Sequence, residues 1–124
     1  MTAVETWSPA DGLTLEKNAL LAVKELEHSL ALTAGPGAGK TEVLAQRADF
    51  LLRTGESRYP KRILAISFKV DASKNLKQRV QKRCGFELAS RFDSYTFHGF
   101  AKRIVDRFRP CLLYTSDAAD EEDS

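Results

Sequence analysis

A glycine-rich stretch in the first third of the chain carries the residues with the clearest chemical potential. Three glycines in five positions let the backbone curl so that its N–H groups converge on an anion. A lysine and a threonine follow directly, offering a point charge for the β- and γ-phosphates of a nucleotide and a hydroxyl ligand for Mg²⁺. We interpret the stretch as a phosphate-binding loop, in which Ala34 replaces the first glycine of the usual pattern. Its residues are Ala34, Gly35, Pro36, Gly37, Ala38, Gly39, Lys40 and Thr41.

The segments on either side of this loop fit the same interpretation. The apolar run at residues 30–33 predicts a strand before the loop, and an amphipathic stretch from Glu42 predicts a helix after it. Strand, glycine-rich turn and helix is the order that a phosphate loop requires, because the helix adds unpaired N–H groups and the positive end of its dipole. The helix is expected to stop at Gly55 and to bury Val43, Leu44, Ala48, Leu51 and Leu52.

Apolar periodicity predicts an alternation of helices and strands along the rest of the chain. Thr14 and Asp71 are expected to cap two of the helices, and Pro110 is expected to end the last one. Strands that alternate with helices indicate an α/β fold, here a partial parallel sheet flanked by helices. The predicted helices cover residues 15–29, 42–54, 71–84 and 97–109, and the predicted strands cover residues 30–33, 63–66 and 92–96.

Size and composition limit the class of protein. The chain has 124 residues, of which 43% are hydrophobic and 29% are charged, which is typical of one globular domain or part of one. We find no run near the ~20 apolar residues that cross a membrane, and no signal peptide at the start. Cys84 and Cys111 have no metal-binding spacing. We therefore expect a cytoplasmic protein without membrane association.

Charge is distributed unevenly. Residues up to Arg109 hold 19 basic and 12 acidic side chains, a net charge of +7, whereas the last eight residues hold five acids. Nine basic residues and a single acid, Asp71, lie between Arg58 and Arg83. Such a block is either a solvated helix face or an electrostatic footprint for a nucleic-acid backbone.

Three motifs, taken together, resemble those of UvrD/Rep-type superfamily 1 DNA helicases. The glycine-rich stretch is similar to their A-G-x-G-[SA]-G-K-T form, which also begins with alanine. Residues 63–68, followed by Ala72 and Arg79-Val80, resemble motif Ia. Residues 95–101 resemble the T-F-H-[GS] stretch of motif Ib. The order and spacing of these motifs agree across about residues 13–109.

This resemblance implies a RecA-like P-loop NTPase fold and a Mg²⁺- and ATP-driven translocase that moves 3′ to 5′ along single-stranded DNA. In that family Lys40 and Thr41 would serve ATP and Mg²⁺, while Phe68, Thr96, Phe97 and His98 would lie along the DNA. Exposed aromatic rings beside basic groups are the usual means of binding single strands. Simple packing is the alternative for Phe68, which follows a strand, and for Phe97, which shares the apolar spacing of its helix.

The sequence departs from the family pattern in two places. Residues 15–19 contain no glutamine where the family has one that reads adenine, and Asn18 is the only amide there. Lys69-Val70-Asp71 stands where motif Ia usually has Thr-Asn-Lys. Adenine selectivity and individual DNA contacts of motif Ia therefore do not carry over from the resemblance.

The expected organisation has three parts. Residues 1–13 form an irregular lead-in, residues 14–110 the N-terminal part of a helicase ATP-binding domain, and residues 111–124 either a translated sequencing adapter or a disordered acidic tail. No Asp-Glu pair follows a strand and no arginine finger is recognisable, so we expect little ATP hydrolysis from these residues alone. Two alternatives to a helicase remain: a helicase–nuclease subunit, and a non-catalytic module that binds nucleotide or nucleic acid.

Overall fold

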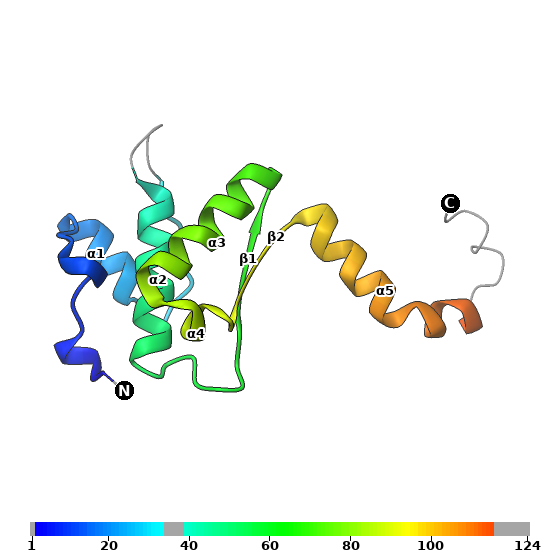
Figure 1. The fold of residues 1–124 in the computed structure, drawn as a ribbon, viewed down its shortest axis with the longest axis horizontal. Coiled ribbons are helices and arrows are strands. Elements are labelled where there is room, and N and C mark those ends of the chain that lie inside the picture. The colour runs from blue at the N-terminus through cyan, green and yellow to red at the C-terminus, as the bar shows by residue number, and fades with distance from the viewer. Residues whose placement is uncertain (1, 34–38, 116–124) are drawn as a thin grey trace.

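The computed structural model describes residues 2–33 and 39–115, with side chains described as far as Arg109. Figure 1 shows helices gathered on one side of a pair of strands, and a last helix that leads away from the other side. The helices of the body are α1 (Lys17–Lys24), α2 (Lys40–Arg53), α3 (Val70–Cys84) and the short α4 (Phe86–Ala89); the strands are β1 (Ile63–Ser67) and β2 (Phe92–Thr96); the last helix is α5 (Phe97–Thr115).

The two strands form a parallel pair, as the sequence predicted. Ile63 lies opposite Phe92 and Ser67 lies opposite Thr96, so the strands are matched over their whole length. Parallel neighbours need a crossover connection, which here runs through α3 and α4. Both strands therefore end at the same edge of the sheet, and the segments that follow them, Phe68 and the start of α5, emerge there together.

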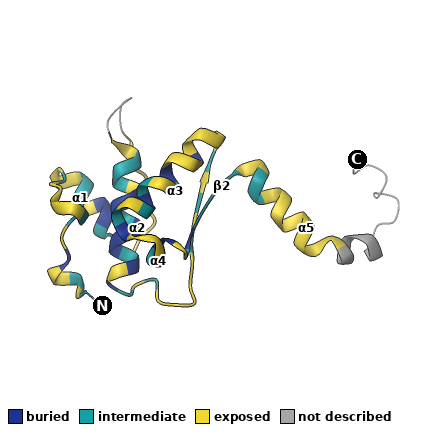
Figure 2. Cartoon of the chain, in the orientation of Figure 1, coloured by how far each residue is buried: buried dark blue, intermediate teal, exposed yellow. Residues whose placement is uncertain are grey.

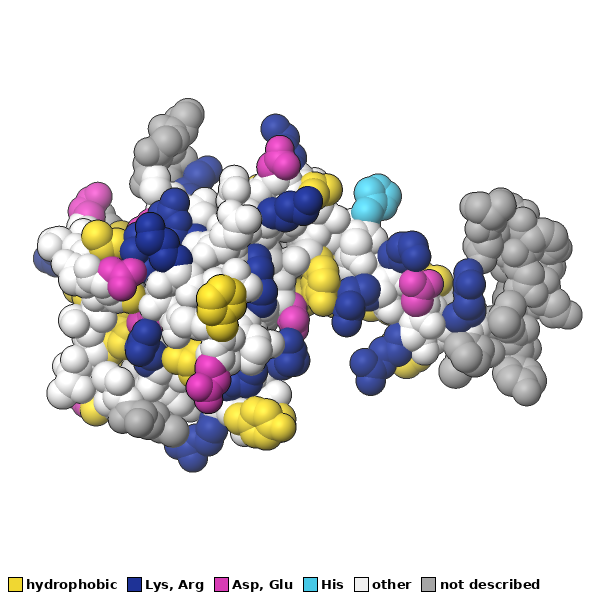
Figure 3. Space-filling model, in the orientation of Figure 1, with side chains coloured by type: hydrophobic (Ala, Val, Ile, Leu, Met, Phe, Trp, Pro, Cys, Tyr) yellow, Lys and Arg dark blue, Asp and Glu magenta, His cyan; other side chains and the backbone are white. Residues whose placement is uncertain are grey.

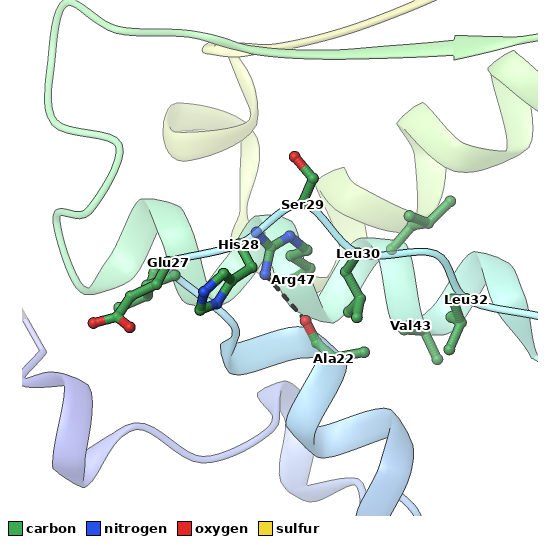
Figure 4. A pocket seen from close by; sticks show the side chains of 10 residues that line it. Ala22, Glu27, His28, Ser29, Leu30, Leu32, Val43 and Arg47 are labelled. Atoms are coloured by element: carbon green, nitrogen blue, oxygen red, sulfur yellow. Dashed lines mark hydrogen bonds between the residues drawn. The ribbon is translucent and has the colours of Figure 1, made fainter.

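The predicted strand at residues 30–33 is wrong, because the structure assigns no strand to these residues. A strand forms only where its backbone finds a neighbour to bond, and the described sheet consists of β1 and β2. Figure 4 shows the segment with Leu30 and Leu32 running beside Val43 of α2. A cavity of about 260 Å³ lies between α2 and β1 and is lined by residues of both. The apolar side chains approach α2, but no strand lies beside their backbone.

Helix α2 lies between two apolar clusters, which makes it the centre of the body (Figure 2). Ala45, Ala48 and Leu52 face α3 and the sheet, where the cluster continues through residues such as Val80. On the other side Phe50 packs edge-on against Trp7, with ring centroids 5.3 Å apart. The sequence predicted Ala48 and Leu52 as core residues correctly. Leu44 is exposed instead, because it faces the cavity beside β1.

The N-terminal segment packs on α2 through polar contacts that apolar periodicity does not reveal. Two single-turn 3-10 helices, η1 (Val4–Thr6) and η2 (Ala10–Gly12), carry it across the body. The Trp7 indole donates to the buried Asp49 carboxylate at 2.8 Å. The Ala10 N–H donates to the buried Gln46 side chain at 2.7 Å. These contacts attach the segment to α2.

Helix α1 is shorter than the predicted helix over residues 15–29, and Thr14 does not cap it, since Glu16 occupies that position. The helix ends because its last carbonyls have another donor. Arg47 Nη1 donates to the carbonyls of Ala22, Val23 and Glu25 at 3.1, 3.1 and 2.8 Å. The charged guanidinium satisfies the backbone groups that a further turn of helix would otherwise bond.

Two other predicted helix ends also need correction. Lys69, and not Asp71, is the N-cap of α3, and Asp71 lies in its first turn, where a negative charge is favourable. Pro110 does not end α5, which continues to Thr115. Proline removes one backbone donor and its ring crowds the carbonyl four residues before it, which disfavours a helix interior, but the helix nevertheless continues past Pro110. Gly85, with φ 86°, follows α3 as predicted.

Candidate nucleotide and nucleic-acid interface

The described end of the glycine-rich stretch is the start of α2. Gly39 is its N-cap and has φ 80°, a left-handed conformation that favours glycine, and Lys40 and Thr41 are the first two helical residues. A Cβ atom added at Gly39 would meet nothing within 4 Å, so the space around this turn is open. The predicted residues Ala34, Gly35, Pro36, Gly37 and Ala38 lie outside the described residues.

The residues at this turn fit a Mg²⁺–triphosphate group by their chemistry. The first N–H groups of a helix have no partner within it and can donate to phosphate oxygens. Lys40 is exposed and Thr41 is half-buried, so an ammonium group and a hydroxyl group are both available at the helix start. Such a ligand would bring the metal with its phosphates. Among the described residues, no cluster of three or more His, Cys, Asp or Glu side chains could hold a metal ion.

Glu42, the next residue of α2, is held by two arginines of α3. Its Oε1 accepts from Arg79 Nη1 and from Arg83 Nη2, each at 2.7 Å. Its Oε2 accepts from Arg83 Nε at 2.9 Å and from Gln46 Nε2 at 2.8 Å. Burial by itself raises the pKa of Glu42, but the hydrogen bonds from Arg83, Arg79 and Gln46 outweigh it and lower this pKa from 4.5 to about 2. The carboxylate is therefore ionised at any physiological pH.

Two aromatic rings meet where the parallel strands end. Phe68 follows β1 and its residue is 88% exposed, and Phe97 begins α5 and is 53% exposed. Their ring centroids lie 5.2 Å apart with the planes tilted by 44°. The interpretation of Phe68 as a core residue is wrong, because such exposure leaves its ring open to solvent. Phe97 is half covered and packs against Phe68.

Thr96 and His98 lie at the same edge but are presented differently. The Thr96 hydroxyl accepts the Gly99 N–H at 3.0 Å, which satisfies one of the unpaired donors at the start of α5. The side chain of Thr96 thus positions the first turn of the helix that carries His98. His98 is exposed. The structure therefore places Phe68, Thr96, Phe97 and His98 at the edge where both strands end.

Figure 1 shows that the start of α2 and the ends of both strands lie on the same side of the molecule. Lys40 and Thr41 thus share this side with the aromatic pair of Phe68 and Phe97. Helix α3 connects the aromatic pair with the start of α2. It begins two residues after Phe68, and further along it Arg79 and Arg83 bind Glu42 of α2.

The basic block at residues 58–83 is partly occupied by contacts within the chain. Lys77 points inward, where its ammonium group donates to the carbonyls of Ala89 and Phe92. Burial lowers the pKa of Lys77. Arg62 is bound to Asp93 at 2.7 and 2.8 Å, and Arg79 and Arg83 to Glu42. Basic side chains nevertheless recur over α3 and along α5 in Figure 3. Four of the nine basic residues in the block thus have partners within the chain.

A second hollow lies between the end of α1 and α2 (Figure 4). It encloses about 480 Å³ and is lined by His28, Leu30, Leu32 and Arg47 among others. None of the predicted site residues lines this hollow. The guanidinium group of Arg47, which does line it, already donates to carbonyls at the end of α1. We assign no ligand to it.

Sequence reasoning missed the role of Glu42 and its two arginines. The partners are 37 and 41 residues away from Glu42, a separation that no local pattern reveals. A weak signal was present nonetheless. Arg79 and Arg83 are four residues apart and therefore project from one face of α3, next to the apolar positions Val80 and Cys84.

Known proteins similar to this chain are DNA helicases. Residues 15–118 match the family of the UvrD/REP helicase N-terminal domain. The chain is 38% identical over 86 residues to DNA helicase IV of Escherichia coli (strain K12) and 41% identical over 86 residues to the ATP-dependent DNA helicase PcrA of Staphylococcus aureus (strain Mu50). Each alignment covers 69% of this chain and 12% of the relative.

A probable DNA helicase II homologue of Mycoplasma genitalium (strain G37) is 36% identical over 72 residues, which is 58% of this chain and 10% of that protein. The chain thus spans about an eighth of the length of the curated relatives it matches. Within its described part, no helix has the length and apolar character needed to cross a membrane.

Proposed function

The chain belongs to the family of UvrD/REP helicase N-terminal domains, and from that premise we propose that it forms the part of an ATP-dependent DNA helicase that binds Mg²⁺–ATP and single-stranded DNA. The whole protein would be the enzyme and would act in the cytoplasm. These 124 residues alone should hydrolyse little ATP, since they correspond to about an eighth of their relatives.

One observation supports the proposal most directly. Two exposed aromatic rings, those of Phe68 and Phe97, lie on the side of the molecule where α2 begins with Lys40 and Thr41. Aromatic rings that bases can stack on are what a single-strand binder needs. A phosphate site and a stacking platform on one side suit a protein that couples the two ligands.

The finer fold assignment is part of the same proposal. We assign β1 and β2 to the RecA-like parallel sheet of a P-loop NTPase. Leu64 and Ile66 of β1 point away from α2 and α3 and are exposed, although parallel strands are normally covered on both faces. Further chain of the whole protein would cover this face.

The nucleotide part of the proposal is tested by titrating the chain with a fluorescent ATP analogue in the presence of Mg²⁺. Lys40→Ala should weaken binding about 10- to 150-fold, because it removes a charge-assisted bond of about 1.5–3 kcal/mol. Lys61→Ala is the matched control, since Lys61 is also an exposed lysine but lies in the turn before β1. Equal affinities for the unaltered chain and Lys40→Ala would contradict the nucleotide site.

The DNA part is tested by fluorescence anisotropy with a labelled oligo-dT. Phe68→Ala should weaken binding about 5- to 150-fold, which corresponds to the loss of about 1–3 kcal/mol of stacking on one base. Phe86→Ala is the control, because Phe86 on α4 is also highly exposed, at 77%. If both variants bind as the unaltered chain does, the aromatic pair is not a DNA platform.

A further inference from the structure

The contact between Glu42 and α3 is unlike an ordinary surface ion pair. The side chains of Glu42 and Arg83 are only 16% and 10% exposed, and one carboxylate receives bonds from two guanidinium groups and one amide. Asp11 extends the cluster, since its Oδ2 accepts from Arg83 Nη1 at 2.6 Å. The cluster therefore joins three segments that are distant in sequence: η2, the first turn of α2, and α3.

Stability alone is a weak explanation for such a cluster. Burying charges costs solvation energy, and apolar side chains at the same positions would hold two helices together as well or better. The interface of α2 and α3 already has apolar contacts through Ala45, Leu76 and Val80. A buried ionic contact instead adds geometric specificity, because its hydrogen bonds fix the position of one helix along the other.

The position of the cluster suggests a purpose for the fixed alignment of α2 and α3. Glu42 directly follows Lys40 and Thr41, so any movement of the first turn of α2 moves its carboxylate. Arg79 is 41% exposed and also lines an open hollow of about 410 Å³ together with Thr41, Asn75, Gln78 and Lys82. One guanidinium thus contacts Glu42 and borders the space beside the proposed Mg²⁺ ligand.

The other end of α3 leads to the proposed DNA platform. The helix has 15 residues, and its N-cap Lys69 immediately follows Phe68. Rigid secondary elements can carry coupling between sites, so a shift imposed at Arg79 and Arg83 would reach the residue that precedes the helix. A continuous path of bonded and packed groups therefore connects Thr41 with Phe68.

We propose that Glu42 is a positioning residue that couples nucleotide binding at the start of α2 to single-stranded DNA binding at Phe68, acting through Arg79, Arg83 and helix α3. This inference rests on the proposed function, because it needs both ligands to bind. Thermodynamic linkage makes the coupling reciprocal: the nucleotide changes the affinity for DNA by the same factor as DNA changes the affinity for the nucleotide.

The test measures the affinity of the chain for labelled oligo-dT without nucleotide and with a saturating, slowly hydrolysed ATP analogue and Mg²⁺. We expect the ratio of the two dissociation constants to be about fivefold or more for the unaltered chain, the usual lower range of such coupling. Glu42→Gln keeps the shape of the side chain but removes its charge. It should bring the ratio to within about twofold of one, because the helices lose their fixed alignment.

A matched control separates coupling from general damage. Asp93→Asn breaks a two-bond ion pair of similar geometry, that with Arg62, at the opposite end of the sheet. It should leave the ratio as in the unaltered chain. If Glu42→Gln does not fold, Arg79→Gln serves in its place, because it removes one of the bonds to the carboxylate and Arg79 is the more exposed partner.

The outcomes are distinct. If Glu42→Gln, or Arg79→Gln in its place, retains the ratio of the unaltered chain, the coupling role is overturned while the proposed function stands. The same holds if the unaltered chain binds both ligands but its ratio is one. If the unaltered chain binds neither the nucleotide analogue nor oligo-dT, the proposed function itself fails.

Discussion

Helices α2 and α5 both have a clear apolar stripe, yet one is the centre of the body and the other is uncovered. Ala45, Ala48 and Phe50 of α2 are fully or almost fully buried, whereas Ile104 and Phe108 of α5 remain about half exposed. The difference does not come from composition. It comes from neighbours: α2 has α1, α3 and the N-terminal segment around it, while α5 leads away from the body (Figure 1). A periodic stripe predicts which face of a helix is apolar, but not what covers that face.

The largest expected difference in stability between the two helices comes from replacing one phenylalanine in each. Phe50→Ala should lower the free energy of unfolding by about 3–5 kcal/mol, because it leaves a cavity beside Trp7. Phe108→Ala should change it by less than about 0.5 kcal/mol, since the side chain is already exposed to water. Urea unfolding followed by tryptophan fluorescence measures both. Equal losses for the two variants would mean that α5 is covered in solution.

A smaller effect concerns acid stability. The pKa of Glu42 is lowered in the folded chain to about 2, so its ionised form stabilises the fold above pH 4.5, and this contribution is lost as the pH falls from 4.5 towards 2. The contribution is at most about 3 kcal/mol. It depends on the charged groups that face the carboxylate, Arg79 and Arg83, and through Arg83 on Asp11.

This pH dependence is measured by urea unfolding at several pH values between 6 and 3. Glu42→Gln should be less stable than the unaltered chain at pH 6, and the difference in free energy of unfolding should narrow as the pH falls below 4.5. The control on α5 is Asp106→Asn, which removes an exposed carboxylate bound to Lys102 at 3.2 Å. A gap that stays constant with pH for Glu42→Gln would argue against the ionised cluster.

Arg47 provides an intermediate effect on α2. Arg47→Met keeps much of the packing but removes the donor to the carbonyls of Ala22, Val23 and Glu25, and it should cost about 2 kcal/mol. The counterpart on α5 is Arg103, whose guanidinium lies 5.0 Å from the centre of the Tyr95 ring. Arg103→Met should cost no more than about 1 kcal/mol. Circular dichroism during thermal unfolding ranks the two, and a larger loss for Arg103→Met would reverse the comparison.

The smallest expected effect is confined to α5. Lys102 and Asp106 form an exposed pair four residues apart, which contributes about 0.3–0.5 kcal/mol. Lys102→Ala should therefore alter the unfolding midpoint only slightly, and added salt should remove the difference because the pair is screened. A loss of stability that persists at about 1 M salt would show that Lys102 makes a contact other than this exposed ion pair.

Sequence reasoning succeeded where local pattern and tertiary environment agree. The strand predicted at residues 63–66 and the apolar edge of α3 follow directly from an apolar run and from helical spacing, and the strand predicted at residues 92–96 is also present. It failed at residues 30–33, because a run of apolar residues has strand character but the described sheet offers it no neighbour. It also failed at the end of α1, where the decisive group, Arg47, comes from another helix.

The candidate site shows the same division. The type and spacing of residues predicted roles for Lys40 and Thr41, and the family resemblance implied DNA contacts for Phe68 and Phe97; these assignments remain predictions. Buried polar residues within α2, such as Gln46 and Asp49, interrupt its apolar pattern and gave no hint of their role. Their partners belong to the N-terminal segment, dozens of residues away, so only the folded chain reveals them.

The inward ammonium group of Lys77 and the paired guanidinium groups of Arg62, Arg79 and Arg83 have a consequence for how ionic strength should act on DNA binding. Only cations free to replace the counterions along a nucleic-acid strand add to the salt dependence of the binding constant. If all nine basic residues of residues 58–83 contacted phosphates, the logarithm of the binding constant would fall with the logarithm of the salt concentration with a slope of about −6. With only the five that have no partner among the described residues, the slope would be no steeper than about −3.5.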